Sequence, residues 1–357
     1  TGGVYDYAFA VSDTTNQTAY QKYMFENYYD LGTGLDSLKP LNKENDIIWD
    51  TSEYPDEYYT EVMDSLYIKK NEARDGIRTF NTKKLKYTYS WFDGNAAARS
   101  SSNRRSFLIN ETVNVYPDTT VWVKDFNYSY NDPMHQDYFF NPAYQDYPVV
   151  GVNWYQAQAF CNWRTMMWRS SRDKYRQYFE GEFRLPNEIQ WEWAARGGRT
   201  ESPYPWGGYY IRNTAGCFLA NFKPMRGRYM EDGGFHTVKV YSYNPNGYGL
   251  YCMSGNVAEW CNTAYHESMM EVAHDLNMDY TYDAKDEEPA VRKRKVIRGG
   301  SFKDIGWYLT TAARSYEYQD TAKCYIGFRN VMTHLGRGGR DLDAENGEEI
   351  QNDIQLK

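Results

Sequence analysis

The stretch YGLYCMSGNVAEW, residues 248–260, is the most informative part of this chain, because it joins a glycine turn to an apolar segment that ends in tryptophan. From residue 147 onward the same pattern repeats: short apolar segments, glycine turns and tryptophans. After residue 206 these segments are too short and irregular to alternate as β-α-β units. The other blocks of this kind are YPVVGVNW (147–154), FRLPNE (183–188), YPWGG (204–208), RGGSF (298–302) and GFR (327–329).

Two helices are indicated around these blocks. Residues 154–164 place apolar side chains at helical spacing, which predicts a helix with one buried face. A second helix is predicted to begin at Asn187, whose side chain can cap it, while the side chain of Gln190 can reach back to the cap amide. Gly197 and Gly198 then end this helix.

The first part of the chain is polar and rich in tyrosine. An amphipathic helix is predicted within residues 15–28, and the alternating valines of residues 112–126 predict a strand, a turn and a second strand. A structureless loop as long as residues 31–146 is implausible, so we expect an ordered insertion that contacts partners. The acidic tail, residues 334–357, is expected to be flexible or to order only on a partner.

Composition narrows the function classes. The chain has 357 residues, with 40 basic and 48 acidic side chains and a formal charge of −8, and its 41% hydrophobic and 25% charged content is typical of a globular protein. No apolar stretch is long enough to span a bilayer as a helix. A negative charge without a basic stripe argues against nucleic acid as a partner. The 36 tyrosines and 11 tryptophans suit broad, semi-polar contact surfaces.

The cysteines and histidines are scattered. Five cysteines cannot all pair within the chain, and no CxxC pair occurs, which argues against zinc ribbons and thioredoxin-type chemistry. The five histidines form no HxxxH or HExxH pair, so we do not expect a histidine-rich metal site. Cys161 falls on the apolar face of the 154–164 helix, and we interpret it as a small core residue.

In their order and spacing, the six blocks together resemble the formylglycine-generating-enzyme (sulfatase-modifying factor) family, over about residues 147–333. The resemblance implies an α+β, loop-rich fold related to C-type lectins. Under this interpretation residues 1–333 form one domain of the family, in which 31–146 are an insertion and 147–333 are the best-matched core. The tail 334–357 then follows the domain.

The same resemblance bears on catalysis. Enzymes of this family oxidise a substrate cysteine with two active-site cysteines that bind copper, and both follow shortly after the RGGS block. Thiolates suit Cu(I) because they are soft ligands. Here residues 301–310 read SFKDIGWYLT, without cysteine, and Asp304 stands near the place of the first one. A single hard carboxylate cannot replace a thiolate pair, so we expect no copper and a pseudoenzyme.

The resemblance also implies calcium, which takes hard oxygen ligands. A first site would use the side chain of Asn221, the carbonyl of Phe222, the side chain of Asp232 and the carbonyl of Gly234 or Phe235. The alternative is that Asn221 and Asp232 cap turns.

A second calcium site would use the carbonyls of Gly255 and Val257 and the carboxylate of Glu259. Cys252 stands where the family has a side-chain oxygen, which removes one ligand. Without a metal ion, Glu259 would be a buried acid that needs other donors.

Further blocks resemble a narrower group, the GldK/PorK family of lipoproteins of the type IX secretion and gliding-motility machinery. The related GldJ lipoproteins are the alternative, but the second-half blocks favour GldK/PorK. The resemblance implies a periplasmic ring that self-assembles, partners a GldN/PorN-like protein, and is held at the inner leaflet of the outer membrane by a lipid anchor outside this chain. These blocks are VNVYPDT (113–119), DFNYSYNDPM (125–134), ANFKP (220–224) and RSYEYQD (314–320).

Three hypotheses follow from the sequence. The first is a non-catalytic scaffold of such a ring, in which aromatic surfaces meet a different surface of the next copy. The second is an enzyme with an active site rebuilt around Asp304. The third is a module that binds peptidoglycan or another glycan, by analogy with the lectin-like relatives alone.

Overall fold

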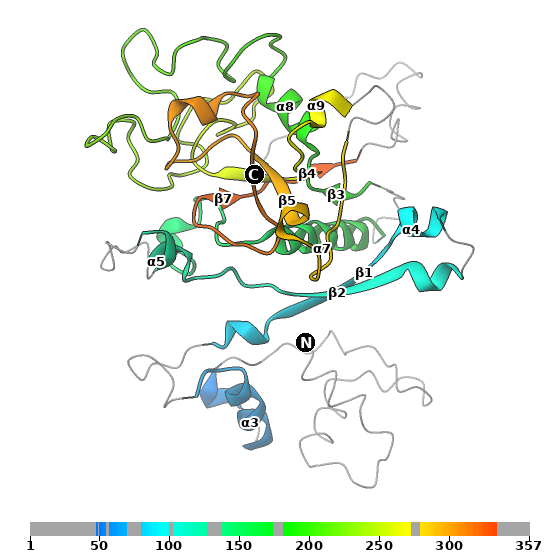
Figure 1. Cartoon of the computed structure of the whole chain (residues 1–357). Helices are drawn as coiled ribbons and strands as arrows, with labels where there is room; N and C mark the ends of the chain where they lie inside the picture. Colours follow the sequence, from blue (N-terminus) through cyan, green and yellow to red (C-terminus); the bar gives the residue numbers. More distant parts are fainter. Residues whose placement is uncertain are drawn as a thin grey trace, which may run out of the picture. The chain divides into compact units, whose positions relative to one another are not determined.

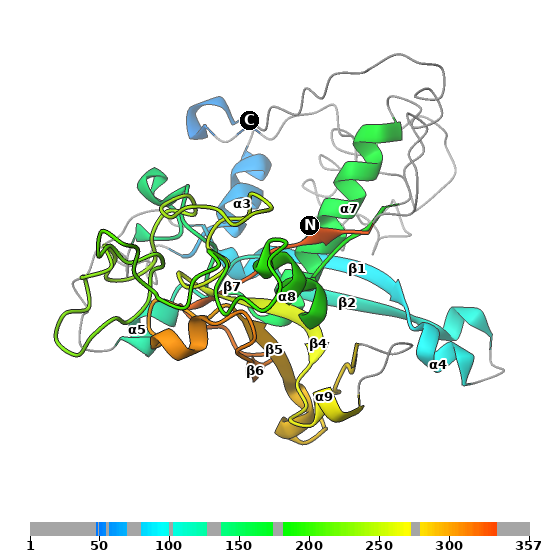
Figure 2. The ribbon, with the colours of Figure 1, turned by 90° about the horizontal axis from the view of Figure 1, so that it is seen from above.

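A computed structural model shows the arrangement of the chain (Figures 1 and 2). It describes residues 48, 50–54, 57–69, 80–99, 103–126, 137–173, 181–272 and 279–333. The helix predicted within residues 15–28 and the acidic tail 334–357 lie outside these ranges. Within them, no helix combines the length and the apolar character needed to cross a bilayer.

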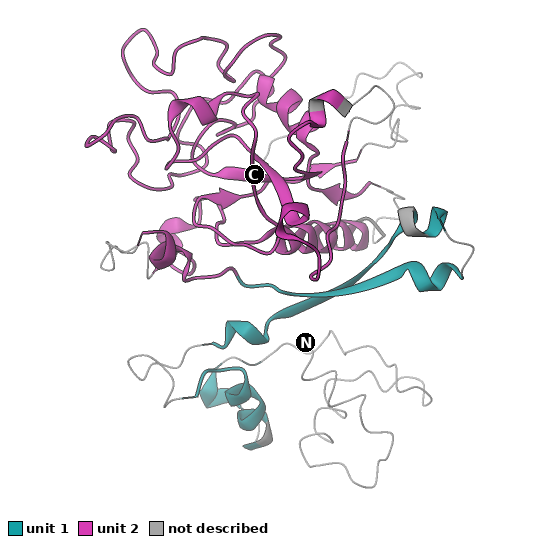
Figure 3. Ribbon diagram, viewed as in Figure 1, with its two compact units in different colours: residues 1–116 teal, residues 117–357 magenta. Residues whose placement is uncertain are grey.

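The chain divides into two compact units, residues 1–116 and residues 117–357 (Figure 3). In the first unit, β1 and β2 form an antiparallel pair whose side chains alternate between exposed and half-buried. On the half-buried face, the carboxylate of Glu111 accepts hydrogen bonds from the Tyr89 hydroxyl and the Trp91 indole. The elements of this unit are η1 (Thr51–Glu53), α3 (Glu57–Ser65), η3 (Thr82–Lys84), β1 (Lys86–Phe92), α4 (Gly94–Ala98), η4 (Arg104–Phe107) and β2 (Leu108–Asn114).

The second unit is built around a four-stranded sheet in the order β6-β5-β4-β7. Strands β4, β5 and β6 pair antiparallel, whereas β7 joins β4 in parallel, and β3 and β8 form a separate antiparallel pair. Its helices are α5 (Val121–Asp125), η5 (Pro142–Tyr144), α7 (Trp154–Asp173), α8 (Glu188–Arg196), α9 (Met269–Val272), η6 (Ala290–Lys293) and η7 (Gly306–Leu309). Its strands are β3 (Phe183–Arg184), β4 (Ala258–Ala264), β5 (Arg294–Arg298), β6 (Ser315–Tyr318), β7 (Ile326–Gly327) and β8 (Val331–Met332).

The core of this unit lies where α7 meets the sheet. Two buried tryptophans cross-link the helix start and the central strand, because the Trp154 indole donates to the carbonyl of Cys261 and the Trp260 indole donates to that of Val152. Both rings therefore stay buried without an unpaired N–H group. Residues 199–257, which join α8 to β4, run almost entirely through turns and bends.

One prediction, the second strand within residues 112–126, is wrong. The first half of this segment belongs to β2, but residues 121–125 form the helix α5. Val121 and Trp122 are both buried in one core cluster, which a strand would prevent because it points successive side chains to opposite faces. Asp118 also accepts a bond from the Thr120 amide at the helix entrance.

Both helices predicted in the second half of the chain are confirmed. Helix α7 continues to Asp173, beyond the expected residue 164. Helix α8 carries the expected capping box: the Gln190 amide donates to Oδ1 of Asn187 at 2.7 Å, and the Asn187 amide donates to Oε1 of Gln190 at 3.2 Å. The helix ends at Gly197, whose φ of 58° is a left-handed value that glycine adopts without strain.

We expect Asn187→Ala to lower the free energy of unfolding by about 1 kcal/mol, because it removes one side of the capping box. Urea unfolding followed by circular dichroism measures this loss. The matched control is Ile189→Ala in the same helix, whose side chain is exposed, with an expected change within about 0.5 kcal/mol. Equal losses in the two variants would contradict the role of the cap.

Candidate functional site

The segment after the RGGS block, where the family's cysteines would lie, is a closed turn. Oδ2 of Asp304 accepts hydrogen bonds from the amide of Ser301 at 2.9 Å and from its hydroxyl at 2.6 Å. The Asp304 amide donates back to the Ser301 carbonyl. The carboxylate of Asp304, near the place of the family's first cysteine, therefore holds the backbone of its own turn.

Helix η7 follows this turn and has one anchored and one exposed side. Leu309 is fully buried, and its carbonyl accepts a hydrogen bond from the Ser254 hydroxyl. Trp307, by contrast, is 75% exposed. This segment thus presents an indole to solvent three residues after Asp304.

All five cysteines are described, and all are free thiols. Burial raises the pKa of the Cys161 thiol to about 12 and that of Cys252 to about 11, and it also raises the pKa values of Cys261 and Cys324. Because the thiolate is the form that binds metal and attacks electrophiles, these four thiols are suited to packing rather than to chemistry.

A buried charge network that the sequence analysis did not identify holds the next segment in place. The guanidinium of Arg298 donates to the carbonyls of Thr311, Ala312 and Ala313, and it also contacts Glu192. A neighbouring pair joins Arg314 to Glu188 of α8 through two bonds, at 2.6 and 2.9 Å. Both arginines and Glu188 lie within the recognised blocks. The sequence therefore marked these residues, but it did not show which of them pair with one another.

The residues of the first calcium site lie together. Oδ2 of Asp232 accepts from the Phe222 amide at 2.7 Å, and Oδ1 accepts from the Gly234 amide at 3.3 Å. The side chain of Asn221 adjoins Gly234, since a Cβ on that glycine would lie 3.0 Å from Oδ1 of Asn221. The Asn221 amide nitrogen donates to the carbonyl of His236 at 2.7 Å.

Two features of this cluster fit a cation. Oδ1 of Asn221 is buried and has no hydrogen-bond partner among the described residues, which is costly for an acceptor unless another donor or an ion meets it. Burial raises the pKa of the Asp232 carboxyl above its ordinary value, although the amides of Phe222 and Gly234 act in the opposite sense. We propose that Asn221, Phe222, Asp232 and Gly234 hold Ca²⁺, which would supply the missing positive charge.

The cluster around Glu259 does not fit a second calcium ion. Nε of Arg329 donates to Oε2 at 2.5 Å and Nη2 donates to Oε1 at 2.6 Å, while the Trp191 indole donates to Oε2 at 2.7 Å. Burial disfavours the charged guanidinium, but Glu259 holds the pKa of Arg329 above its ordinary value. Protein donors therefore already satisfy this carboxylate, as the sequence analysis requires of a buried acid without metal.

Other groups of this second cluster make hydrogen bonds within the protein. The amide of Gly255 donates to the carbonyl of Gly299, and a Cβ at Gly255 would collide with the carbonyl oxygen of Asn221. The thiol of Cys252 donates to the carbonyl of Val240. The amide of Ala258, which follows Val257, donates to the backbone carbonyl of Tyr325, next to strand β7.

A model of the "Sulfatase-modifying factor enzyme 1-like domain" family matches residues 69–334, so the chain belongs to the sulfatase-modifying factor family. The α+β fold expected from the sequence is therefore confirmed.

Individual relatives are similar over part of their length. The chain is 31% identical to the formylglycine-generating enzyme of Mus musculus, over 53% of this chain and 45% of that protein. It is 30% identical to the inactive C-alpha-formylglycine-generating enzyme 2 of the same species, over 55% and 52%. The chain thus spans about half the length of these curated relatives. Among solved structures, PvdO from Pseudomonas aeruginosa matches with a TM-score of 0.41 and 22% identity, over 53% of this chain and 63% of that one.

For calcium, we expect Ca²⁺ to raise the midpoint of thermal unfolding, and a concentration of one hundred times the Kd would add about 2.7 kcal/mol of stability. Asp232→Asn removes the charge but keeps the shape, so this shift should be largely lost. Differential scanning fluorimetry with Ca²⁺, and with Mg²⁺ at the same concentration, measures it. The control is Glu231→Gln, which should respond as the natural chain does; an equal shift in Asp232→Asn would refute the site.

For the Glu259 cluster, we expect Glu259→Gln to lower the free energy of unfolding by about 3 kcal/mol, because it leaves the guanidinium of Arg329 without its counter-charge. The matched control is Glu288→Gln, which breaks an exposed ion pair with Arg292 and should cost less than about 1 kcal/mol. Chemical unfolding of both variants measures the difference. A loss at Glu259 no larger than that of the control would show that the pair does not anchor the fold.

Proposed function

We propose that this chain is a non-catalytic structural component of a periplasmic ring in a type IX protein secretion or gliding-motility system, of the GldK/PorK type. One observation supports the proposed absence of catalysis. The segment after RGGS contains no cysteine, and Asp304, which stands near the place of the first cysteine, accepts hydrogen bonds from Ser301. A carboxylate that closes a turn does not supply the thiolate pair that suits Cu(I).

Exposed aromatic loops beside this turn support a role in assembly. Tyr209 and Tyr210 are 79% and 80% exposed, and Trp307 is 75% exposed. The loops that carry them pack together, because the Tyr204 hydroxyl donates to the carbonyl of Gly306. Large amphipathic rings of this kind are enriched at protein interfaces, and a ring requires a surface that meets a different surface on the next copy.

The remaining parts of the proposal follow from the GldK/PorK resemblance. The partner is a GldN/PorN-like protein, and the location is the periplasm, at the inner leaflet of the outer membrane, with a lipid anchor that lies outside this chain. The acidic character of the protein, with a charge of −8, is consistent with a partner other than nucleic acid.

Two alternatives compete with this proposal. An enzyme rebuilt around Asp304 would need a base or nucleophile, whereas Oδ2 of Asp304 already accepts two hydrogen bonds from Ser301. A glycan-binding module would use the exposed aromatic rings as stacking surfaces, and saturable binding to purified sacculi at physiological salt would favour it. The described contacts at these rings suit either a glycan or a protein, and the GldK/PorK resemblance favours the ring scaffold.

The first test is the native mass of the detergent-extracted protein, measured by mass photometry together with identification of co-purifying proteins. We expect a megadalton-scale particle that contains a stoichiometric second protein. We also expect no oxidation of a cysteine peptide by the purified protein. A monomer near 42.0 kDa without a partner would overturn the scaffold proposal.

The aromatic loops are tested in the same assay with the double variant Tyr209→Ser and Trp307→Ser. We expect the large particle to be lost or reduced while the thermal unfolding midpoint stays unchanged, because both side chains are largely exposed. The matched control is Trp193→Ser, which removes an exposed indole from α8 (65% exposed). An intact particle in the double variant would place the contacts elsewhere.

A further inference from the structure

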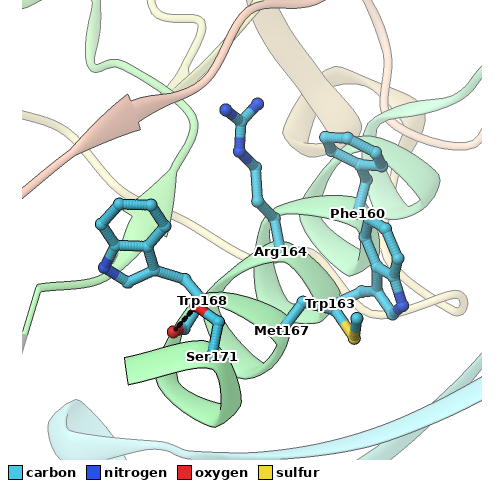
Figure 4. Close-up of a pocket in the computed structure, with 6 residues that line it drawn as sticks. All are labelled: Phe160, Trp163, Arg164, Met167, Trp168 and Ser171. Carbon is cyan, nitrogen blue, oxygen red and sulfur yellow. Dashed lines mark hydrogen bonds between the residues drawn. The ribbon is translucent and has the colours of Figure 1, made fainter. Parts of the chain in front are cut away.

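Helix α7 carries an open apolar groove that the described residues leave unfilled. The groove has a volume of about 340 Å³ (Figure 4), and its lining consists of Phe160, Trp163, Arg164, Met167, Trp168 and Ser171. These positions recur at helical spacing and form one stripe about 16 Å long. Trp163 is 45% exposed and Met167 is 54% exposed. A stripe of this kind is typical of a surface that binds another segment.

The last described part of the chain runs beside this groove. The ring of Phe328 lies 5.4 Å from that of Phe160, and Asn330 accepts a hydrogen bond from Arg164. Further along, the Thr333 amide donates to the carbonyl of Glu182, whose carboxylate pairs with Arg169. The chain thus follows α7 in the direction of the helix, and its last described residue, Thr333, lies near the groove.

The charges of the helix and the tail are complementary. Helix α7 contains three arginines and a single acid, Asp173. Residues 341–356 contain six acidic residues and no lysine or arginine. Opposite charges of this kind favour the encounter of two surfaces and set their orientation.

The tail also has apolar anchors and sufficient length. Leu342, Ile350, Ile354 and Leu356 are interspersed among its acids, and the glycine-rich stretch 336–339 can form a reversal. Residues 334–356 reach up to about 75 Å when extended, several times the length of the groove. The tail can therefore turn back along α7 from its starting point.

We propose that residues 341–356 of this chain dock on the α7 groove of the same chain, with their apolar side chains against Trp163 and Met167 and their carboxylates toward Arg164 and Arg169. A tail that starts beside the groove has a high effective concentration there, which favours it over segments from other molecules. The docked tail would cover the exposed apolar stripe.

Photo-crosslinking of the full chain tests this proposal. Trp163 is replaced by p-benzoylphenylalanine, and the crosslinked peptides are identified by mass spectrometry. We expect crosslinks to residues 341–356 in a species of monomer mass. A mixture of ¹⁵N-labelled and unlabelled chains separates crosslinks within one chain from those between copies. The matched control places the same photo-reactive residue at Trp193, an exposed indole of α8, and should give no tail crosslinks.

Variants of the tail test the chemistry without touching the folded core. The double variant Ile350→Asp and Ile354→Asp should lower the crosslink yield about tenfold, because it removes two apolar anchors. The control variant Gln351→Asp and Gln355→Asp adds the same charge at neighbouring positions and should keep most of the yield. Crosslinks to residues 1–116, crosslinks only between copies, no crosslinks at all, or equal losses in both variants would each overturn the proposal.

Discussion

The buried carboxylate of Glu259 joins three separate segments of the second unit. It lies in the central strand β4 and accepts bonds from Arg329, after β7, and from Trp191, in α8. Trp191 lies 68 residues before Glu259 and Arg329 lies 70 residues after it, and both bind this one carboxylate. In a buried site each partner would be costly without the others, so the three must fold together. Glu259 and Arg329 belong to two of the recognised blocks, and Trp191 follows a third, FRLPNE, in helix α8.

A second interaction fixes the backbone of the segment that follows the RGGS block. The RGGS block keeps Arg298, whose guanidinium collects three backbone carbonyls, so the segment that follows is positioned as firmly as a catalytic segment would need. Yet that segment carries Asp304 bound to Ser301, and an exposed Trp307. The fold alone therefore does not define the chemistry of this segment, which depends on its local side chains.

Local patterns were the most predictable. The capping box of α8 involves residues three apart, so Asn187 and Gln190 could be recognised without knowledge of the fold. The segment 112–126 could not, because the alternating valines suit a strand and only the burial of Trp122 among distant aromatic rings selects the helix α5. The open stripe on α7 could not be predicted either. Helical spacing shows which residues share a face of the helix, but not which part of that face stays exposed.

The sequence by itself determined the family blocks, the capping of α8 and the absence of cysteine after RGGS, because each of these is a matter of residue identity or of short spacing. Only the tertiary structure decided how the two calcium candidates differ. Among the described residues, Oδ1 of Asn221 is buried without a hydrogen-bond partner, whereas the carboxylate of Glu259 accepts hydrogen bonds from Arg329 and Trp191. Whether a buried oxygen is satisfied depends on donors far away in the chain, and spacing along the sequence does not contain that information.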